Sequence, residues 1–208
     1  MWENLLSFSL ATLVLAISPG PDNIYVLTQS LTNGVKSGIA TTAGLISGCI
    51  VHTTLLAFGI SAIITASPNI FYAIKVFGAI YLLFLAYRVF RSDASISITE
   101  KRETPQTSVS YARLFRIGVT MNLVNPKVML FFLAFFPAFL WNKEGDTVLQ
   151  FYVLGLTFMA VSFFVFGGIA LLAGYISSFL KRSKSIGLFL KWLQIIVFVG
   201  IAIYILVP

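Results

Sequence analysis

Six long apolar segments separated by short polar ones dominate this 208-residue sequence and leave it few ways to fold. They comprise residues 5–28, 39–66, 70–90, 113–140, 148–176 and 186–207. A helix that crosses the hydrocarbon core of a bilayer needs about 20 apolar residues, so each segment is long enough. Strands of a membrane barrel would be about 10 residues long and would alternate apolar with polar side chains. We therefore expect an all-α membrane protein with six transmembrane helices.

The scarcity of charge points the same way. Only 10% of the residues are charged, whereas a soluble domain has about 25%. So few charges cannot cover a water-exposed surface, so a lipid bilayer is the expected environment. The net charge of +7 does not indicate a nucleic-acid partner, because the basic residues lie in loops between apolar segments, as expected of a membrane topology signal.

The distribution of Lys and Arg predicts the orientation. Eleven of the 14 basic residues lie in alternate loops or their flanks: Lys36, Arg88, Arg91, Lys101, Arg102, Arg113, Arg116, Lys181, Arg182, Lys184 and Lys191. By the positive-inside rule these loops are cytoplasmic. The first segment has no basic start and no small-residue cleavage site, so we expect it to be retained as a helix. Both termini are then expected outside.

The polar residues 91–111 divide the chain into two halves. We expect a first three-helix repeat at residues 1–90, a cytoplasmic linker loop at 91–111 and a second three-helix repeat at 112–208. The first helix would enter the membrane from outside and the fourth from the cytoplasm. The two repeats would therefore be inverted relative to each other, an architecture common in secondary transporters.

Two apolar segments are interrupted near their middles, at corresponding places in the two halves. The first break is Ser-Pro-Gly-Pro-Asp-Asn at residues 18–23, and the second is Asn-Leu-Val-Asn-Pro-Lys at residues 122–127. Proline removes a backbone donor and clashes with the preceding turn, so we expect both helices to be interrupted there. Backbone groups freed at membrane depth must face protein or water.

Each helix can restart after its break. Ser18 or Gly20 can cap the first restarted helix and Asn125 the second, each with a proline directly after it. The restarted N-termini would form an anion site near the middle of the membrane. The carbonyl groups around residues 16–17 and 122–124 would suit a cation such as an ammonium group.

Two charges coincide with the breaks. Asp22 is the only acidic residue within the six segments, and Lys127 is the only basic residue well inside one. Charges at membrane depth are costly and commonly functional. They can bind a zwitterion and a proton, or they can form a structural ion pair, and the two roles are compatible. The candidate substrate-binding residues are Ser18, Pro19, Gly20, Pro21, Asp22, Asn23, Asn125, Pro126 and Lys127.

The second segment carries small and polar residues at helical spacing: Thr41, Gly44, Gly48, His52 and Gly59. They predict a face that contacts another helix closely, within the chain or in a homodimer. His52 is the only histidine. It is either a packing residue bonded to a backbone carbonyl or, like Asp22, a proton-coupling candidate.

Catalytic and metal chemistry lack the necessary groups. Ser61 and His52 fall on opposite faces of one predicted helix, and an aspartyl mechanism needs two acids where only Asp22 is available. One His, one Cys and one membrane acid are too few for a metal site. We therefore expect no enzyme activity, no metal and no cofactor.

Residues 18–23, together with Asn125-Pro126-Lys127 in the fourth segment, resemble the LysE/RhtB family of amino-acid exporters. The chain length, six segments and central polar loop resemble that family too. The resemblance implies export of amino acids or close derivatives across a bacterial inner membrane, by proton antiport. It does not identify the substrate. The alternatives are an exporter of another small solute or cation in the same superfamily, and a non-transporting membrane scaffold.

Overall fold

The computed structural model describes residues 1–18, 20–92, 110–142, 145–182 and 184–206, and these form helices without strands. The predicted all-α class is thus confirmed. Most of the predicted linker loop lies outside the described residues. The helices are α1 (Trp2–Ile17), α2 (Pro21–Asn33), α3 (Val35–Leu55), the π-helical turn η1 (Leu56–Ile60), α4 (Ser61–Ala66), α5 (Pro68–Arg91), α6 (Tyr111–Val124), α7 (Pro126–Phe135), the 3-10 turn η2 (Phe136–Phe139), α8 (Thr147–Leu171), α9 (Ala173–Arg182) and α10 (Lys184–Leu206).

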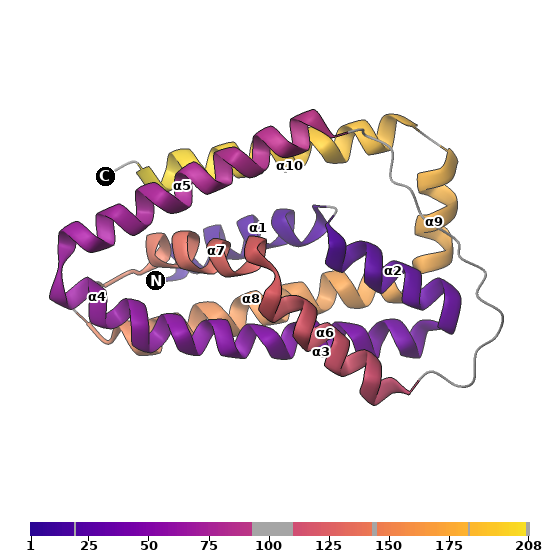
Figure 1. Cartoon of the computed structure of the whole chain (residues 1–208), viewed down its shortest axis with the longest axis horizontal. Coiled ribbons are helices and arrows are strands. Elements are labelled where there is room, and N and C mark those ends of the chain that lie inside the picture. Colours follow the sequence, from indigo (N-terminus) through magenta and orange to yellow (C-terminus); the bar gives the residue numbers. More distant parts are fainter. Residues whose placement is uncertain (19, 93–109, 143–144, 183, 207–208) are drawn as a thin grey trace.

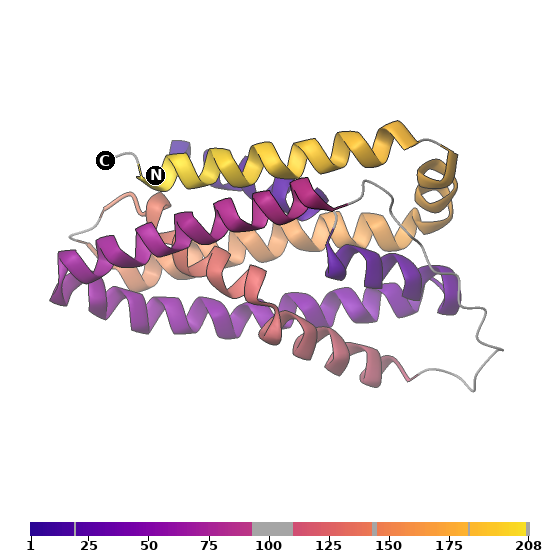
Figure 2. The ribbon, with the colours of Figure 1, turned by 45° about the horizontal axis from the view of Figure 1, so that its top comes forward.

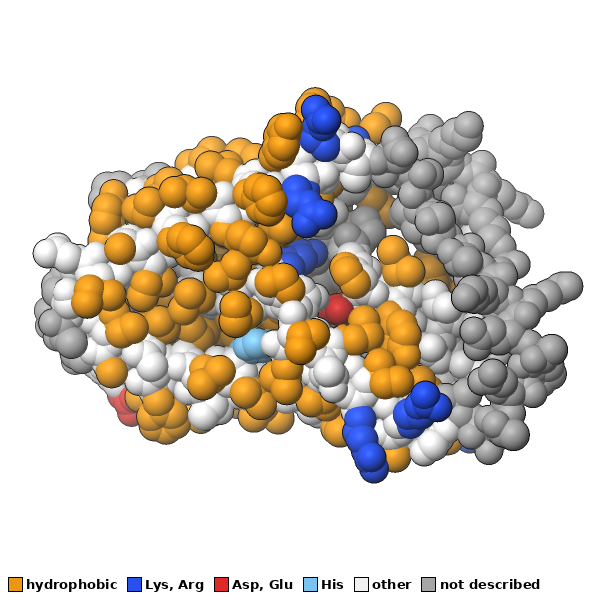
Figure 3. All heavy atoms as spheres, in the orientation of Figure 1, with side chains coloured by type: hydrophobic (Ala, Val, Ile, Leu, Met, Phe, Trp, Pro, Cys, Tyr) orange, Lys and Arg blue, Asp and Glu red, His pale blue; other side chains and the backbone are white. Residues whose placement is uncertain are grey.

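The helices are long and apolar enough to cross a membrane up to six times. Four of these spans are continuous: Val35–Ile63, Asn69–Arg91, Thr147–Leu171 and Gly187–Leu206. The other two are bent pairs, in which α1 and α2 meet at 59° and α6 and α7 at 55°. The bends lie at the two predicted breaks. Hydrophobic side chains cover much of the face shown in Figure 3. The Lys and Arg side chains visible in that view lie toward its middle and right, away from its left end.

The broken helices meet in the middle of the bundle. Figures 1 and 2 show α5 beside α10 along one side and α3 with α8 along another, with α7 between them, whereas α6 crosses α3 and extends beyond it. Helix α1 starts at the end of the bundle where α10 finishes, and α6 starts at the opposite end (Figure 1). The two bent pairs therefore run in opposite directions through the bundle.

One predicted segment differs in extent. The apolar run at residues 148–176 was expected to form one helix, but α8 ends at Leu171 and a separate helix, α9, begins at Ala173. Leu172 between them has φ −97° and ψ 14°, which bends the chain. Figure 1 shows α9 crossing the end of the bundle. The apolar composition continues across this bend, so hydropathy does not reveal it.

The small residues of α3 pack against α6. A Cβ on Gly44 would lie 2.1 Å from the carbonyl oxygen of Phe115, and a Cβ on Gly118 would lie 2.4 Å from that of Thr41. The predicted close helix contact is thus made within the chain. Gly59 does not share it, since nothing lies within 4 Å of its ideal Cβ. The π-helical turn Leu56–Ile60 ends the regular spacing that the prediction assumed.

Helix α7 and the turn after it carry an aromatic core. Phe131, Phe132, Phe135 and Phe136 are all buried and stack on one another, with ring centroids 4.4 Å apart for Phe131–Phe135 and 4.1 Å apart for Phe132–Phe136. Phe8 of α1 packs on this cluster, with its ring centroid 5.4 Å from that of Phe135. The cluster fixes α7 against α1 and fills the bundle between the second break and the end where α1 starts.

Candidate functional site

At the first break, residues of the break itself cap the helix ends and hydrogen-bond a freed carbonyl. Gly20 has extended backbone angles and is the N-cap of α2, with Pro21 as the first helical residue. The alternative cap, Ser18, instead ends α1. Asn23 Nδ2 donates to the carbonyl of Ala16 at 2.7 Å, so the predicted carbonyl end of the first half-helix already has a partner. Pro19 lies outside the described residues.

The second break is capped as predicted. Asn125 is the N-cap of α7, and its Oδ1 accepts a hydrogen bond from the Lys127 backbone N–H at 3.0 Å. Pro126 is the first residue of α7. The carbonyl of Asn122, in the last turn of α6, accepts from the Asn125 N–H at 3.2 Å and also lies 3.2 Å from His52 Nε2.

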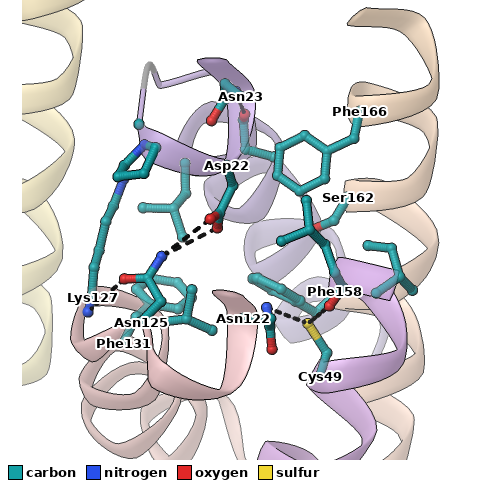
Figure 4. A pocket seen from close by; sticks show the side chains of 17 residues that line it. Asp22, Asn23, Cys49, Asn122, Asn125, Lys127, Phe131, Phe158, Ser162 and Phe166 are labelled. Atoms are coloured by element: carbon teal, nitrogen blue, oxygen red, sulfur yellow. Dashed lines mark hydrogen bonds between the residues drawn. The ribbon is translucent and has the colours of Figure 1, made fainter. Parts of the chain in front are cut away.

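The two breaks meet through Asp22 and Asn125. Asn125 Nδ2 donates to the Asp22 carboxylate, at 3.2 Å from Oδ2 and 3.4 Å from Oδ1. Both side chains face the same cavity in Figure 4. One asparagine therefore caps α7 with its oxygen and holds the acid of α2 with its nitrogen. This contact joins residues 103 positions apart in the chain.

Lys127 approaches the first break from the second. Its Nζ would lie 3.4 Å from a Cβ on Gly20, the N-cap of α2, and it lies 5.3 Å from the ring centre of Phe198 in α10. Within the described residues, the Asp22–Lys127 salt bridge that the sequence suggested is not formed. A buried ammonium group beside a helix N-terminus concentrates positive charge where an anion can bind.

A cavity of about 50 Å³ lies between the breaks (Figure 4). This is room for a few water molecules. It is lined by Leu15, Ala16, Gly20, Pro21, Asp22, Asn23, Leu45, Ile46, Cys49, Asn122, Asn125, Lys127, Val128, Phe131, Phe158, Ser162 and Phe166. Six of the nine predicted site residues thus line one cavity, whereas Ser18 and Pro126 lie beside it.

Comparison with known proteins identifies the family of this chain. The model of the LysE type translocator family matches residues 13–207. The chain belongs to this family. The resemblance seen in the sequence is therefore confirmed, and the translocator is a membrane protein. Because members of this family are transporters, the expectation that it is not an enzyme agrees with the match.

Two curated relatives illustrate the range of the family. The translocator is 31% identical to the homoserine/homoserine lactone efflux protein of Salmonella typhimurium over 178 residues, 86% of this chain and 84% of the relative. It is 26% identical to the leucine efflux protein of Salmonella choleraesuis over 200 residues, 96% of this chain and 92% of the relative. No solved structure matches it.

His52 of the translocator lies behind the cavity. It is buried, its ring contacts Phe132 at 5.4 Å between centroids, and its Nε2 reaches the Asn122 carbonyl. Since a carbonyl only accepts, Nε2 is the donor. This geometry matches the interpretation as a packing residue bonded to a backbone carbonyl. A part for His52 in proton coupling stays a prediction.

Several lining residues were not among the predicted site residues, although Asn122 had been placed in the second break. Cys49 of α3 and Asn122 of α6 are neighbours in the cavity lining, where Asn122 Nδ2 donates to the Cys49 sulfur at 3.5 Å. Phe158, Ser162 and Phe166 line it from α8. Their spacing of four residues places them on one helix face, and a serine between phenylalanines in an apolar helix was the signal available for them.

Proposed function

We propose that this translocator exports amino acids or close derivatives from the cytoplasm across the bacterial inner membrane, in exchange for protons. The efflux activities named for the two relatives support amino acids as the substrate class. The observation that carries the proposal is the meeting of Asp22, Asn125 and Lys127 in one cavity between two helix breaks. These groups provide complementary charges for a zwitterion.

The substrate carboxylate binds at Lys127 and the N-terminus of α2. Lys127 Nζ lies next to Gly20, whose helix presents free N–H groups and a partial positive charge. The substrate ammonium group binds the Asp22 carboxylate in place of the Asn125 amide. A simple cation is a weaker candidate, because the buried ammonium group of Lys127 would repel it.

Asp22 also carries the coupling proton. Its carboxylate is buried, and it can neutralise its charge by binding either a proton or the substrate ammonium group, but not both. Protonation from the outside then displaces the substrate, and loss of the proton to the cytoplasm prepares the site for the next molecule. Because the proton and the substrate ammonium group compete for Asp22, export of the substrate is coupled to entry of a proton.

The two three-helix repeats are inverted relative to each other, and their relative movement opens the site to each side of the membrane in turn. Both termini face outward. Support comes from the opposite directions of the bent pairs and from matching contacts, since α3 packs on α6 as α8 packs on α1. The α2–α3 turn, beside Lys36, lies at the cytoplasmic end.

Efflux from reconstituted vesicles tests the function. Purified protein in liposomes preloaded with single labelled amino acids should release at least one of them faster than protein-free liposomes. An imposed proton gradient directed into the vesicles should accelerate that release. Absence of release across the whole amino-acid panel would overturn the proposal. Release that requires no carboxylate, as with simple amines, would favour a cation exporter.

A further inference from the structure

The cavity between the breaks has two chemically different sides. Asp22, Asn125 and Lys127 place their charged and amide groups on one side. Phe158, Ser162 and Phe166 project from α8 on the side away from Lys127 (Figure 4). A zwitterion held at the charged side would therefore direct its side chain toward this face of α8.

Ser162 is the polar group in that face, and it lacks an internal partner. Its residue is 2% exposed, and within the described part of the chain its hydroxyl makes no hydrogen bond. Thr157, on the same helix, instead donates to the Val153 carbonyl at 2.8 Å. A hydroxyl that lines a cavity and has no protein partner adds no hydrogen bond to the folded state, so alanine at position 162 should cost little stability.

The neighbouring polar groups on Cys49 and Asn122 are either hydrogen-bonded or enclosed by protein. The Cys49 thiol accepts from Asn122 at 3.5 Å and donates to the Leu45 carbonyl at 3.6 Å. Asn122 Oδ1 has no hydrogen-bond partner within the described residues, but it is enclosed by protein beside Gly48, where a Cβ would lie 2.6 Å from it. Hydrogen-bonding capacity directed at the substrate side chain is thus concentrated at Ser162.

We infer that Ser162 is a specificity-determining residue. Its hydroxyl forms a hydrogen bond with a polar group on the substrate side chain, while Phe158 and Phe166 hold the apolar part. This inference rests on the proposed function, because it assumes that an amino acid binds between the breaks. It predicts a preference for short side chains that end in a hydroxyl over methyl-ended side chains of the same size.

Homoserine and norvaline test this, since they differ only by a hydroxyl in place of a methyl group. The ratio of their kcat/KM values for efflux from liposomes is compared in wild type, S162A, S162T and T157V. S162A should lower the homoserine preference by about fivefold to tenfold, the value of one buried hydrogen bond. S162T, which keeps a hydroxyl, should retain it. T157V removes a hydroxyl from α8 outside the cavity and should leave the ratio unchanged.

Stability separates specificity from structure. S162A should have a Tm no lower than wild type, because the hydroxyl it removes has no partner. An unchanged ratio in S162A, or an equal change in T157V, would overturn the inference while leaving amino-acid export standing. A wild-type protein that releases no amino acid would overturn the proposed function, and this inference with it.

Discussion

Asn125 holds Asp22 across the centre of the bundle, with its Nδ2 3.2 Å from Oδ2 of the carboxylate. The same side chain caps α7 through Oδ1, which accepts from the Lys127 N–H at 3.0 Å. Any movement that separates the two helix breaks must therefore break the contact with Asp22, while the cap can persist. The hydrogen bond from Asn125 is therefore expected to break or form as Asp22 binds or releases a proton or a substrate ammonium group.

Replacing Asn125 should separate these two roles. Asn125→Ser keeps a capping hydroxyl but is too short to reach Asp22, whereas Asn125→Ala loses both. We expect both variants to lose most export, because Asp22 is no longer held. Only Asn125→Ala should also lose the cap, worth about 1 kcal/mol, which thermal unfolding in detergent would measure. Normal export by the serine variant would show that the Asp22 contact is dispensable.

Lys127→Met should weaken carboxylate binding. Methionine keeps most of the length and apolar bulk of the lysine but lacks its charge. Charge-assisted bonds are worth about 1.5–3 kcal/mol, so the KM for an amino acid should rise by about tenfold or more. Inhibition by the matching primary amine, which lacks the carboxylate, should not weaken. A parallel loss for both compounds would instead indicate a structural role for Lys127.

Gly44 should be intolerant of a side chain. Alanine there would place Cβ 2.1 Å from the Phe115 carbonyl oxygen, so α3 and α6 would have to separate. We expect Gly44→Ala to destabilise the protein by about 1–3 kcal/mol. Gly200→Ala in α10 is the matched control, because nothing lies within 4 Å of its ideal Cβ. Equal thermal stability of the two variants would contradict the close α3–α6 contact.

Cysteine labelling can determine the orientation. The free Cys49 is buried and would be replaced by alanine to give a background without thiols. Ser92 after α5 and Asn69 near its start lie at opposite ends of that helix and are exposed. An impermeant maleimide should label Asn69→Cys in intact cells and Ser92→Cys only after lysis. The reverse pattern would place the termini in the cytoplasm.

Local chemistry explains why the breaks and caps could be predicted. Proline and glycine interrupt helices whatever surrounds them, so Asn125 was identifiable as a cap from neighbouring residues alone, and the cap of α2 was narrowed to Ser18 or Gly20. The apolar segments likewise predicted the spans. The predicted closeness of Gly44 to another helix was also correct, since a small side chain is what such packing requires.

Partners across the bundle could not be predicted. An Asp22–Lys127 ion pair was one of the two roles that the sequence left open for these charges, yet Asn125 is the residue that donates a hydrogen bond to the acid. That choice depends on the 55° bend between α6 and α7, which no local pattern gives. Ser162 was missed for the same reason: its role depends on which face of α8 meets the cavity. The π-helical turn at Leu56–Ile60 removed Gly59 from a face that regular spacing had assigned to it.

The central claim is that Asp22 couples a proton to export. Asp22→Asn keeps the shape of the side chain but cannot exchange a proton. Asp146→Asn is the matched control, because Asp146 caps α8 outside the cavity, accepting from Leu149 N at 2.9 Å, and asparagine caps equally well. Both variants should be folded and inserted, which is checked by expression level and thermal unfolding.

The most direct measurement is amino-acid efflux from liposomes with and without an imposed pH gradient. Wild type and Asp146→Asn should accelerate efflux when the gradient is applied. Asp22→Asn should show no acceleration at any gradient. A well-folded Asp22→Asn protein whose efflux responds to the gradient at the wild-type rate would contradict the account, and would make His52 the next residue to test.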